Sequence, residues 1–529
     1  MTRPSKRIAL RTAALAGIAA VALAACSGQD GANSSGGGTV DPNGVLTYGM
    51  SLVTGAGSHF DPTISRAEAV DLLPMQMVYG TLLRAGDNGT LQPWMAKDVR
   101  IVDPKTVNIT LRPGVKFSDG SSYDATAVKT SMMRLHTQAT PAALDQLAGF
   151  QSLASLDVVD PLTVVAHLNQ PLAAVFEAAL AGEPGAIQSP KQIAEDPGAI
   201  ETKPIGAGPY KLTAFQPQQI ISFRKNPDFW DAGSWKLGGL DIVNTAAGAP
   251  MANGLIAGTV DMANQVPPPS VNSLKNGNFA THVVSNNLVE LMLCPTKPPL
   301  DNEAVRQAIQ SGIDRQAFNT LLYAGLGQPA YSLVQEGSPY FDPKIKDIVG
   351  YNPDKAKQLL ASSGTPNVSL DVYLVASNNF GQQAEVLQQQ LGKIGVNVQV
   401  HTELNIYNGW IAAQKPGALL TYLVGTEPGS YTLFQRFFQK GGSYAYCGSS
   451  APEVMNLVNQ AAALPPNDPQ AVANYRQAAL LVAQHAYAIP ILLNPTVFGW
   501  NTSRVGGTPT FTSTDGIPLP RLDSLYIKK

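Results

Sequence analysis

The spacing of hydrophobic and polar residues changes repeatedly along this chain, and each change marks the start of an expected helix or strand. Alternation with a period of two predicts strands, and apolar residues spaced by three or four predict helices. The expected strands are residues 45–52, 106–111, 162–168, 210–223, 369–376, 396–401 and 490–494. The expected helices are residues 67–83, 125–136, 302–322, 353–362, 382–391 and 470–484. This alternation of helices and strands predicts a mixed α/β protein.

The order of elements and the residues just before some helices add local detail. Strand, helix and strand over residues 369–401 predict a parallel pair with a right-handed crossover. Asp124 stands at the N-cap position ahead of residues 125–136, and Asp301 or Asn302 caps residues 302–322. No repeat with a period of 20–50 residues is present, so the elements predict a multi-lobed body rather than a solenoid.

The first residues follow a different pattern. A cationic start is formed by Arg3, Lys6, Arg7 and Arg11. The apolar stretch at residues 12–25 is too short to span a bilayer, but it is typical of an export signal. Its ending, Leu23-Ala24-Ala25-Cys26, resembles the lipobox of bacterial lipoproteins, which implies cleavage before Cys26 and a diacylglycerol on its thiol. An ordinary signal peptide with an incidental cysteine is the alternative.

The segment after Cys26 predicts how the body is held. Residues 31–38 are rich in Gly and Ser and predict a flexible tether. No later run of the sequence reaches the eighteen or more apolar residues of a transmembrane helix. We therefore expect a body outside the cytoplasm, anchored to the cell membrane by lipid on Cys26.

Composition and charge narrow the class of protein. Of the 529 residues, 44% are hydrophobic and 14% charged, and a chain of this length predicts two or more lobes. Removing the signal leaves 32 basic against 38 acidic residues, a net charge of −6. A mildly acidic body without a basic cluster argues against a nucleic-acid partner. Cys294 and Cys447 remain after Cys26, and the sequence leaves open whether they pair.

Several motifs occur in the order of one protein family. They are FDP (60–62), VYGTL (78–82), LQPWMA (91–96), LRPGVKFSDG (111–120), PIGAGPYKL (204–212), FRKNPDFW (223–230), KPPLDNEAVRQAIQSGIDR (297–315) and YNPDKAKQLLASSG (351–364). Together they resemble the extracytoplasmic solute-binding proteins of the peptide/nickel class, family 5, which are receptors of ATP-driven (ABC) importers. Within them, we interpret Arg306 and Arg315 as scaffold residues or rim ion pairs rather than ligand contacts.

The resemblance implies a two-lobed, class II periplasmic-binding-protein fold with hinge strands and an extra subdomain in the first lobe. It also implies a solute enclosed between the lobes, the permease subunits of an importer as partners, and a monomer without a cofactor, metal site or enzymatic activity. The expected boundaries are 1–25 for the signal, 26–43 for the tether, 44–75, 204–290 and 490–529 for the core of lobe I, 76–203 for the extra subdomain, and 291–489 for lobe II.

The family alignment also suggests the ligand site. In peptide-binding members, an Asp ahead of a Glu-Pro or Asp-Pro turn pairs with the α-amino group of the ligand. Aligning Glu427 and its following proline with that turn places Val424 where the Asp belongs, which implies a less charged pocket. Glu427 is the alternative carboxylate, unless it is simply solvated. The remaining expected lining is His59, Phe60, Tyr407, Trp410 and Tyr422, with core packing, or a structural hydrogen bond for His59, as the alternative.

Other functions stay open at this point. A surface hydrolase is disfavoured because no GxSxG, HExxH or SxxK motif stands in a fitting context, and the six His lack metal-ligand spacing. A non-transporting sensor or chaperone receptor could use the same scaffold. Within the import interpretation, peptide, nickel chelate, haem and sugar ligands all have precedents in the family.

Overall fold

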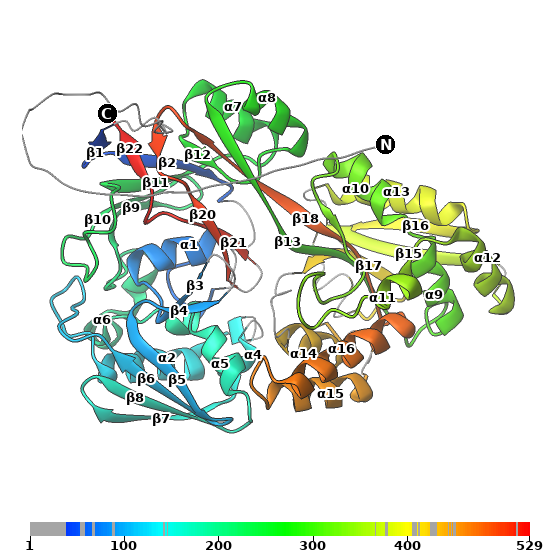
Figure 1. The fold of residues 1–529 in the computed structure, drawn as a ribbon, viewed down its shortest axis with the longest axis horizontal. Coiled ribbons are helices and arrows are strands. Elements are labelled where there is room, and N and C mark those ends of the chain that lie inside the picture. Colours follow the sequence, from blue (N-terminus) through cyan, green and yellow to red (C-terminus); the bar gives the residue numbers. More distant parts are fainter. Residues whose placement is uncertain are drawn as a thin grey trace, which may run out of the picture. The chain divides into compact units, whose positions relative to one another are not determined.

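Two long antiparallel strands, β13 (Phe279–Leu293) and β18 (Ala488–Asn501), connect two groups of strands in one large sheet of the computed structural model (Figure 1). The order is β16-β15-β17-β13-β18-β12-β2-β11-β10-β9, and β14 also pairs with β18. β13 borders the group that begins with β17, and β18 borders the group that begins with β12. The structure describes residues 39–529 except 53–58, 66–68, 87–89, 141–142, 145–146, 366, 376–378, 405–409, 411–412, 424–430, 443, 446, 448–450 and 515–516.

The first group of strands runs from β12, which borders β18, to β9 at the edge of the sheet. Its strands are β2 (Val45–Met50), β9 (Tyr210–Gln216), β10 (Ile220–Lys225), β11 (Gly239–Asn244) and β12 (Met262–Ala263). Its helices are α1 (Ala69–Val78), α7 (Ala249–Ala257) and α8 (Val271–Lys275). Leu46 and Tyr48 of β2 are both fully buried because alternate residues of a strand share one face.

A separate four-stranded sheet follows the order β5-β6-β8-β7. Its strands are β5 (Ala96–Asp103), β6 (Thr106–Leu111), β7 (Leu153–Asp160) and β8 (Thr163–Leu168). Its helices are α2 (Ala125–Gln138), α4 (Ala148–Gln151), α5 (Ala173–Ala179) and α6 (Pro190–Glu195). Asp124 Oδ1 accepts the N–H of Ala127 at 3.0 Å, which confirms the predicted N-cap. Val107 and Ile109 of β6 belong to the same hydrophobic core as Leu46 of β2.

The second group of strands runs from β17, which borders β13, to β16 at the other edge of the large sheet, and it includes β14. Its strands are β14 (Gln328–Pro329), β15 (Val368–Val375), β16 (Val396–Glu403) and β17 (Ala418–Leu423). Its helices are α9 (Glu303–Gly312), α10 (Arg315–Tyr323), α11 (Ile345–Val349), α12 (Pro353–Ser362), α13 (Phe380–Gly392), α14 (Tyr431–Phe438), α15 (Pro452–Ala462) and α16 (Pro469–Gln484). β15 and β16 are parallel and joined through α13, so the predicted parallel strand–helix–strand unit is confirmed, and its right-handed crossover stays a prediction.

Short elements complete the described chain. The short strands are β1 (Val40–Asp41), β3 (Leu83–Ala85), β4 (Leu91–Pro93), β19 (Val505–Gly506), β20 (Thr510–Thr514), β21 (Ile517–Arg521) and β22 (Tyr526–Lys528). The 3-10 turns are η1 (Glu183–Gly185), η2 (Pro197–Glu201) and η3 (Pro268–Ser270).

Alternate residues of β13 enter two different hydrophobic cores. Val289 and Leu291 pack with residues of α9, α10, α12 and α13, which we call the α9–α13 cluster. Leu288 and Met292 pack with residues of α14, α15 and α16, which we call the α14–α16 cluster. Helices therefore cover both faces of this part of the sheet, and residues 288–293 of β13 are buried on both sides.

The single helix expected at residues 302–322 is wrong, because the structure has two helices there. α9 ends at Gly312, and Asp314 then caps α10 by accepting the N–H of Ala317 at 2.9 Å. A side-chain oxygen that satisfies the first turn of a new helix favours the break over a continuous helix. Asn302 rather than Asp301 caps α9, through the N–H of Ala304 at 3.0 Å.

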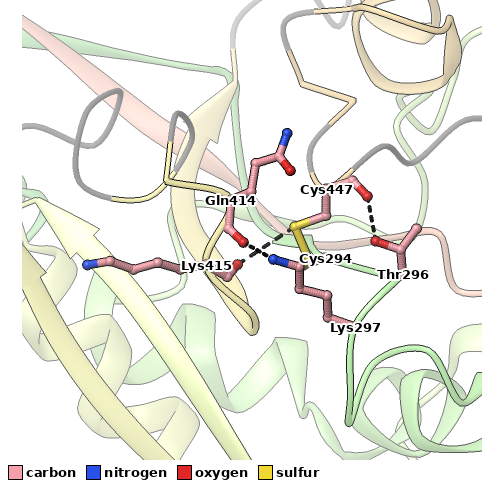
Figure 2. Close-up of a disulfide and its surroundings, with 6 residues drawn as sticks. All are labelled: Cys294, Thr296, Lys297, Gln414, Lys415 and Cys447. Carbon is pink, nitrogen blue, oxygen red and sulfur yellow. Dashed lines mark hydrogen bonds between the residues drawn. A yellow bond between two sulfur atoms is a disulfide. The ribbon is translucent and has the colours of Figure 1, made fainter.

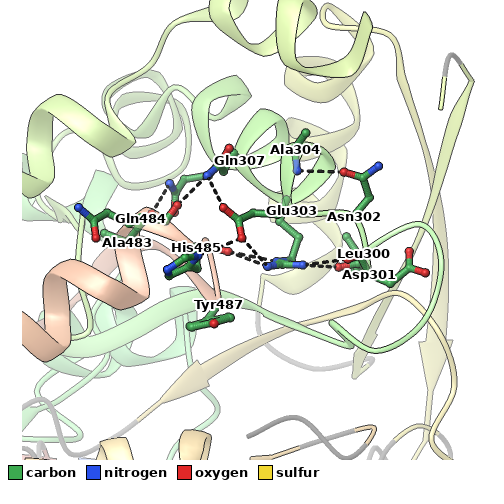
Figure 3. Close-up of polar contacts among 12 residues, drawn as sticks. Leu300, Asp301, Asn302, Glu303, Ala304, Gln307, Ala483, Gln484, His485 and Tyr487 are labelled. Atoms are coloured by element: carbon green, nitrogen blue, oxygen red, sulfur yellow. Dashed lines mark hydrogen bonds and ion pairs between the residues drawn. The ribbon is translucent and has the colours of Figure 1, made fainter. Parts of the chain in front are cut away.

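Arg306 and Arg315 hold backbone carbonyls, as the scaffold interpretation predicted. Arg306 donates to the carbonyls of Leu300 and His485 at 2.9 and 3.0 Å, and His485 also contacts Glu303 at 2.9 Å (Figure 3). Arg315 donates through Nε to the carbonyls of Ala330 and Pro490 at 2.8 and 2.9 Å. The contacts of Arg306 join α9 to the end of α16, and those of Arg315 join α10 to β18.

A disulfide joins Cys294 to Cys447, which settles the pairing that the sequence left open (Figure 2). Cys294 directly follows β13, and Cys447 lies 153 residues later in the chain. Two hydrogen bonds lie beside it. Thr296 Oγ1 donates to the carbonyl of Cys447, and Lys297 Nζ donates to that of Gln414. The disulfide and these hydrogen bonds connect the segment that follows β13 to Gln414, which precedes β17, and to Cys447, which follows α14.

Some expectations concern residues outside those that the structure describes. Cys26, the signal and residues 26–38 of the tether are among them. Within the described residues, no helix is both long and apolar enough to cross a membrane. The lobe boundaries expected from the sequence stay a prediction.

Candidate functional site

Four of the seven expected ligand residues fall on described parts of the chain: His59, Phe60, Trp410 and Tyr422. The other three, Tyr407, Val424 and Glu427, lie outside the described residues, and their roles stay predictions.

Phe60 is a core residue in this structure. Its side chain is fully buried, and its ring centroid lies 5.4 Å from that of Phe215 and 6.4 Å from that of Phe223. Its carbonyl accepts the hydroxyl of Tyr79 at 3.0 Å. The alternative of core packing accounts for these contacts, and a ligand role for Phe60 stays a prediction.

His59 lies at the edge of a buried charged network. Its Nδ1 is 3.1 Å from Glu201 Oε2, while Glu201 Oε1 accepts the N–H of Asp61 at 2.7 Å. Asp61 in turn forms a double contact with Arg134. Burial alone would raise the pKa of Asp61, but hydrogen bonds from Arg134 and Thr63 outweigh it and lower the pKa. The network fixes the backbone after His59, whose ligand role stays a prediction.

Trp410 packs in the α14–α16 cluster, which also contains both cysteines of the disulfide. Its side chain is almost fully buried, and its ring centroid lies 6.2 Å from that of Tyr373. Tyr373 also stacks on His401 at 4.8 Å, and the Lys415 ammonium lies 5.2 Å from its ring. Core packing again accounts for the contacts of Trp410.

Tyr422 takes part in a hydrogen-bond network with α13. Its hydroxyl donates to Asn379 Oδ1 at 2.6 Å and accepts from Gln383 Nε2 at 2.7 Å. Gln383 also donates to the hydroxyl of Tyr323 at 2.9 Å. Burial, followed by the influence of Tyr323, raises the pKa of Tyr422 well above its ordinary value. The polar end of Tyr422 is therefore engaged inside the second group of strands, and its contact with a ligand stays a prediction.

Sequence reasoning missed one residue with unusual chemistry, Glu290 on β13. Its side chain is fully buried, and none of the described residues gives either carboxyl oxygen a hydrogen bond. Burial raises the pKa of this carboxyl well above its ordinary value. The available signal was a single Glu within the apolar run LVELML, on a strand expected to be a hinge.

The described residues offer no group of three or more His, Cys, Asp or Glu side chains placed to hold a metal ion.

Comparison with known families supplies the deciding observation. Residues 90–445 match the model of the bacterial extracellular solute-binding proteins, family 5. This chain belongs to that family. Family 5 proteins are extracytoplasmic, non-enzymatic transport receptors, so the hydrolase alternative is excluded. The predicted family is confirmed.

The sequence identity to individual relatives is low. The chain is 30% identical to the glutathione-binding protein GsiB of Salmonella paratyphi A over 303 residues, which is 56% of this chain and 58% of the relative. The match thus spans little more than half the length of that relative.

Two solved structures share the fold. The dipeptide-binding protein of Pseudoalteromonas sp. SM9913, in complex with Met-Leu, superposes with a TM-score of 0.77 at 21% identity and covers 91% of this chain and 100% of its own. NikA of Brucella suis, in complex with Fe(III)-EDTA, gives 0.78 at 19% identity, covering 91% and 99%. The two-lobed α/β fold implied by the sequence motifs is confirmed.

Proposed function

We propose that this chain is the lipid-anchored receptor of an ABC importer, and that it delivers a small solute of the peptide class to the permease subunits. The family match over residues 90–445 carries the proposal. The lipobox-like ending at Cys26 supports the anchor.

The arrangement of β13 and β18 supports a mechanism by closure. β13 pairs with β17 of the second group, β18 pairs with β12 of the first group, and the two long strands pair with each other, so a change in the twist of this pair would move one group relative to the other. A solute that contacts both lobes stabilises the closed form by its differential affinity. The permease subunits then recognise the closed receptor.

The solute class rests on the relatives. GsiB is named for glutathione, and the Pseudoalteromonas protein was solved with Met-Leu, so both names concern peptides. Fe(III)-EDTA in the NikA structure shows that the same fold encloses a metal chelate in that protein. We propose a peptide-class solute, and a chelate, haem or sugar would be recognised as a different outcome of the experiment below.

The deciding experiment combines capture and uptake. The chain is purified under native conditions, denatured, and the released small molecules are identified by mass spectrometry. Uptake of the identified solute is then measured in cells with and without the gene. A peptide-class solute whose uptake depends on the gene supports the proposal. Unchanged uptake would instead favour a non-transporting sensor or chaperone on the same scaffold.

The anchor is tested separately with Cys26→Ala. This variant should bind the same solute but leave the membrane fraction and appear in the medium or periplasm. Retention in the membrane fraction would contradict the anchor without affecting the receptor function.

A further inference from the structure

Glu290 lies in the interior of the large sheet on β13, one of the two long strands that connect the groups. It is paired with Thr421 of β17 on one side and with Pro490 of β18 on the other. The register between β13 and β17 is unbroken over residues 288–293, so Glu290 shares a face with Leu288 and Met292. This is the face of the α14–α16 cluster.

The neighbouring groups leave this carboxyl without a partner among the described residues. Pro490 has no N–H, and the hydroxyl of Thr421 contacts the carbonyl of Tyr422 at 3.4 Å. Arg315 reaches β18, but its Nε donates to the carbonyl of Pro490. The structure gives no ion pair between Glu290 and any described cation.

The helices that cover this face carry buried hydroxyl groups and a buried cation. Tyr431 of α14 and Tyr475 of α16 are buried hydroxyl groups, and Tyr373 of β15 lies in the same cluster. Arg436 of α14 is buried as well, with its guanidinium 5.6 Å from the ring of Tyr444. None of these residues forms a hydrogen bond or ion pair with Glu290 in the part of the chain that the structure describes.

Such a residue is costly if its role is only structural. An ionised carboxylate buried without a partner costs several kcal/mol, and even the neutral acid leaves hydrogen-bonding groups unsatisfied. Met or Leu, which occupy the neighbouring positions on this face, would fill the space without that cost. The acid therefore points to a positive group that is supplied from outside the chain.

We propose that Glu290 is the counter-charge for an ammonium or guanidinium group of the bound solute. This inference rests on the proposed receptor function and narrows its solute class to cationic molecules. It also explains how the receptor binds a cation although Val424 stands where the family alignment expects an acid. The negative charge comes from Glu290 on β13 instead.

The proposed binding step includes a proton. In the free protein the enclosed carboxyl holds its proton, in keeping with the raised pKa that its burial causes. The cationic group forms an ion pair with the carboxylate, and the displaced proton leaves to the solvent. Binding should therefore release up to one proton per solute, and the affinity should rise with pH until the free carboxyl ionises.

Isothermal titration calorimetry of the full mature chain tests the inference. The probes are glutathione, L-Ala-L-Ala and agmatine, with N-acetyl-L-Ala-L-Ala as the probe that lacks the amine. Each titration is repeated in two buffers of different ionisation enthalpy, which measures the protons released. Glu290→Gln removes the charge at nearly constant volume, and Glu385→Gln makes the same change at an exposed position of α13.

We expect the wild-type chain to bind an amine- or guanidinium-bearing probe with proton release. Glu290→Gln should weaken this binding by about 30-fold or more and abolish the proton release, whereas Glu385→Gln should change neither. Equal affinities of the wild type and Glu290→Gln, or equal binding of the acetylated probe, would overturn the inference and leave the receptor function intact. A wild-type chain that binds none of the probes would count against the peptide-class function itself.

A second variant covers a failure of Glu290→Gln to fold. Glu290→Met matches the apolar neighbours on the same face and should be folded at pH 7, as checked by circular dichroism. It should show the same loss of affinity, and undiminished binding by Glu290→Met would equally overturn the inference.

Discussion

Arg134 and Asp61 form a two-pronged ion pair in the interior, with Nη1–Oδ1 and Nη2–Oδ2 separations of 2.7 and 2.5 Å. About a tenth of each side chain is exposed. Arg134 comes from α2, while Asp61 follows Phe60 in the FDP motif, so the pair fixes the backbone at Asp61 against α2. The motif residue Asp61 thus has a structural role.

Removal of one member should be strongly destabilising. Arg134→Met leaves Asp61 buried without its cation, so we expect the free energy of unfolding to fall by about 3–5 kcal/mol. Urea denaturation followed by circular dichroism measures this. Arg224→Met is the control, because Arg224 pairs with Asp241 at the surface and should cost less than about 1 kcal/mol. Similar losses in the two variants would contradict this prediction.

The same pair predicts a response to acid. Because the pKa of Asp61 is lowered in the folded protein, its contribution to stability is complete above the unfolded value of about 3.9 and is lost as the pH falls through the lower folded value. Asp61→Asn removes this titration. We expect the unfolding free energy of the variant to depend less on pH below about pH 4 than that of the wild type. Parallel curves in this range would show that Asp61 titrates normally.

The disulfide should contribute measurably to stability. It closes a long loop, with Cys294 and Cys447 separated by 153 residues. Cys294→Ala/Cys447→Ala should lower the free energy of unfolding by about 2–5 kcal/mol, measured by guanidinium denaturation. Dithiothreitol should destabilise the wild type to the same extent and leave the double variant unchanged. An effect of the reductant on the double variant would point to another cause.

The aromatic site expected from the sequence is tested by Tyr407→Ala and Tyr422→Ala. If these side chains contact the solute, each substitution should weaken its binding by about tenfold or more in a calorimetric titration. Tyr351→Ala, at an exposed position, is the matched control. Tyr422→Phe separates two roles for Tyr422, since it keeps the ring and removes only the hydroxyl that bonds Asn379 and Gln383. Unchanged affinity in both alanine variants would remove these residues from the site.

Features set by a few neighbouring residues could be predicted from the sequence. Asp124 and its helix, the helix Pro353–Ser362 and the parallel unit around α13 depend on local capping, on Pro at the first turn and on hydrophobic period. The break between α9 and α10 was missed because Asp314 reads equally well as an exposed residue of one long helix. Tertiary packing, rather than pattern, decides such cases.

The site was harder to predict for the same reason. An aromatic residue such as Phe60 or Trp410 follows the same pattern whether it lines a pocket or fills a core, and only the contacts with Phe215 or Tyr373 distinguish the two. Glu290 was missed because its meaning depends on what surrounds it. In a surface strand the same residue would be an ordinary solvated acid.

Glu290 also predicts how the stability of the unliganded protein depends on pH. Its folded pKa is raised well above the ordinary value, so the folded state keeps a proton that the unfolded chain releases above about pH 4.3. The unfolded state then binds fewer protons than the folded state, and Glu290 lowers stability as the pH rises towards its folded pKa, by up to about 1.4 kcal/mol per pH unit. Glu290→Gln abolishes this contribution.

We therefore expect Glu290→Gln without solute to be at least as stable as the wild type at pH 7, and the difference between them to shrink towards pH 5. Urea denaturation of both proteins at several pH values between 5 and 8 measures the difference directly. Glu385→Gln should give curves parallel to those of the wild type, because its carboxyl is exposed. A Glu290→Gln variant whose stability follows the wild type at a constant offset would show that Glu290 ionises normally in the folded protein. The carboxyl would then have a partner in solution, such as an ordered water or an ion.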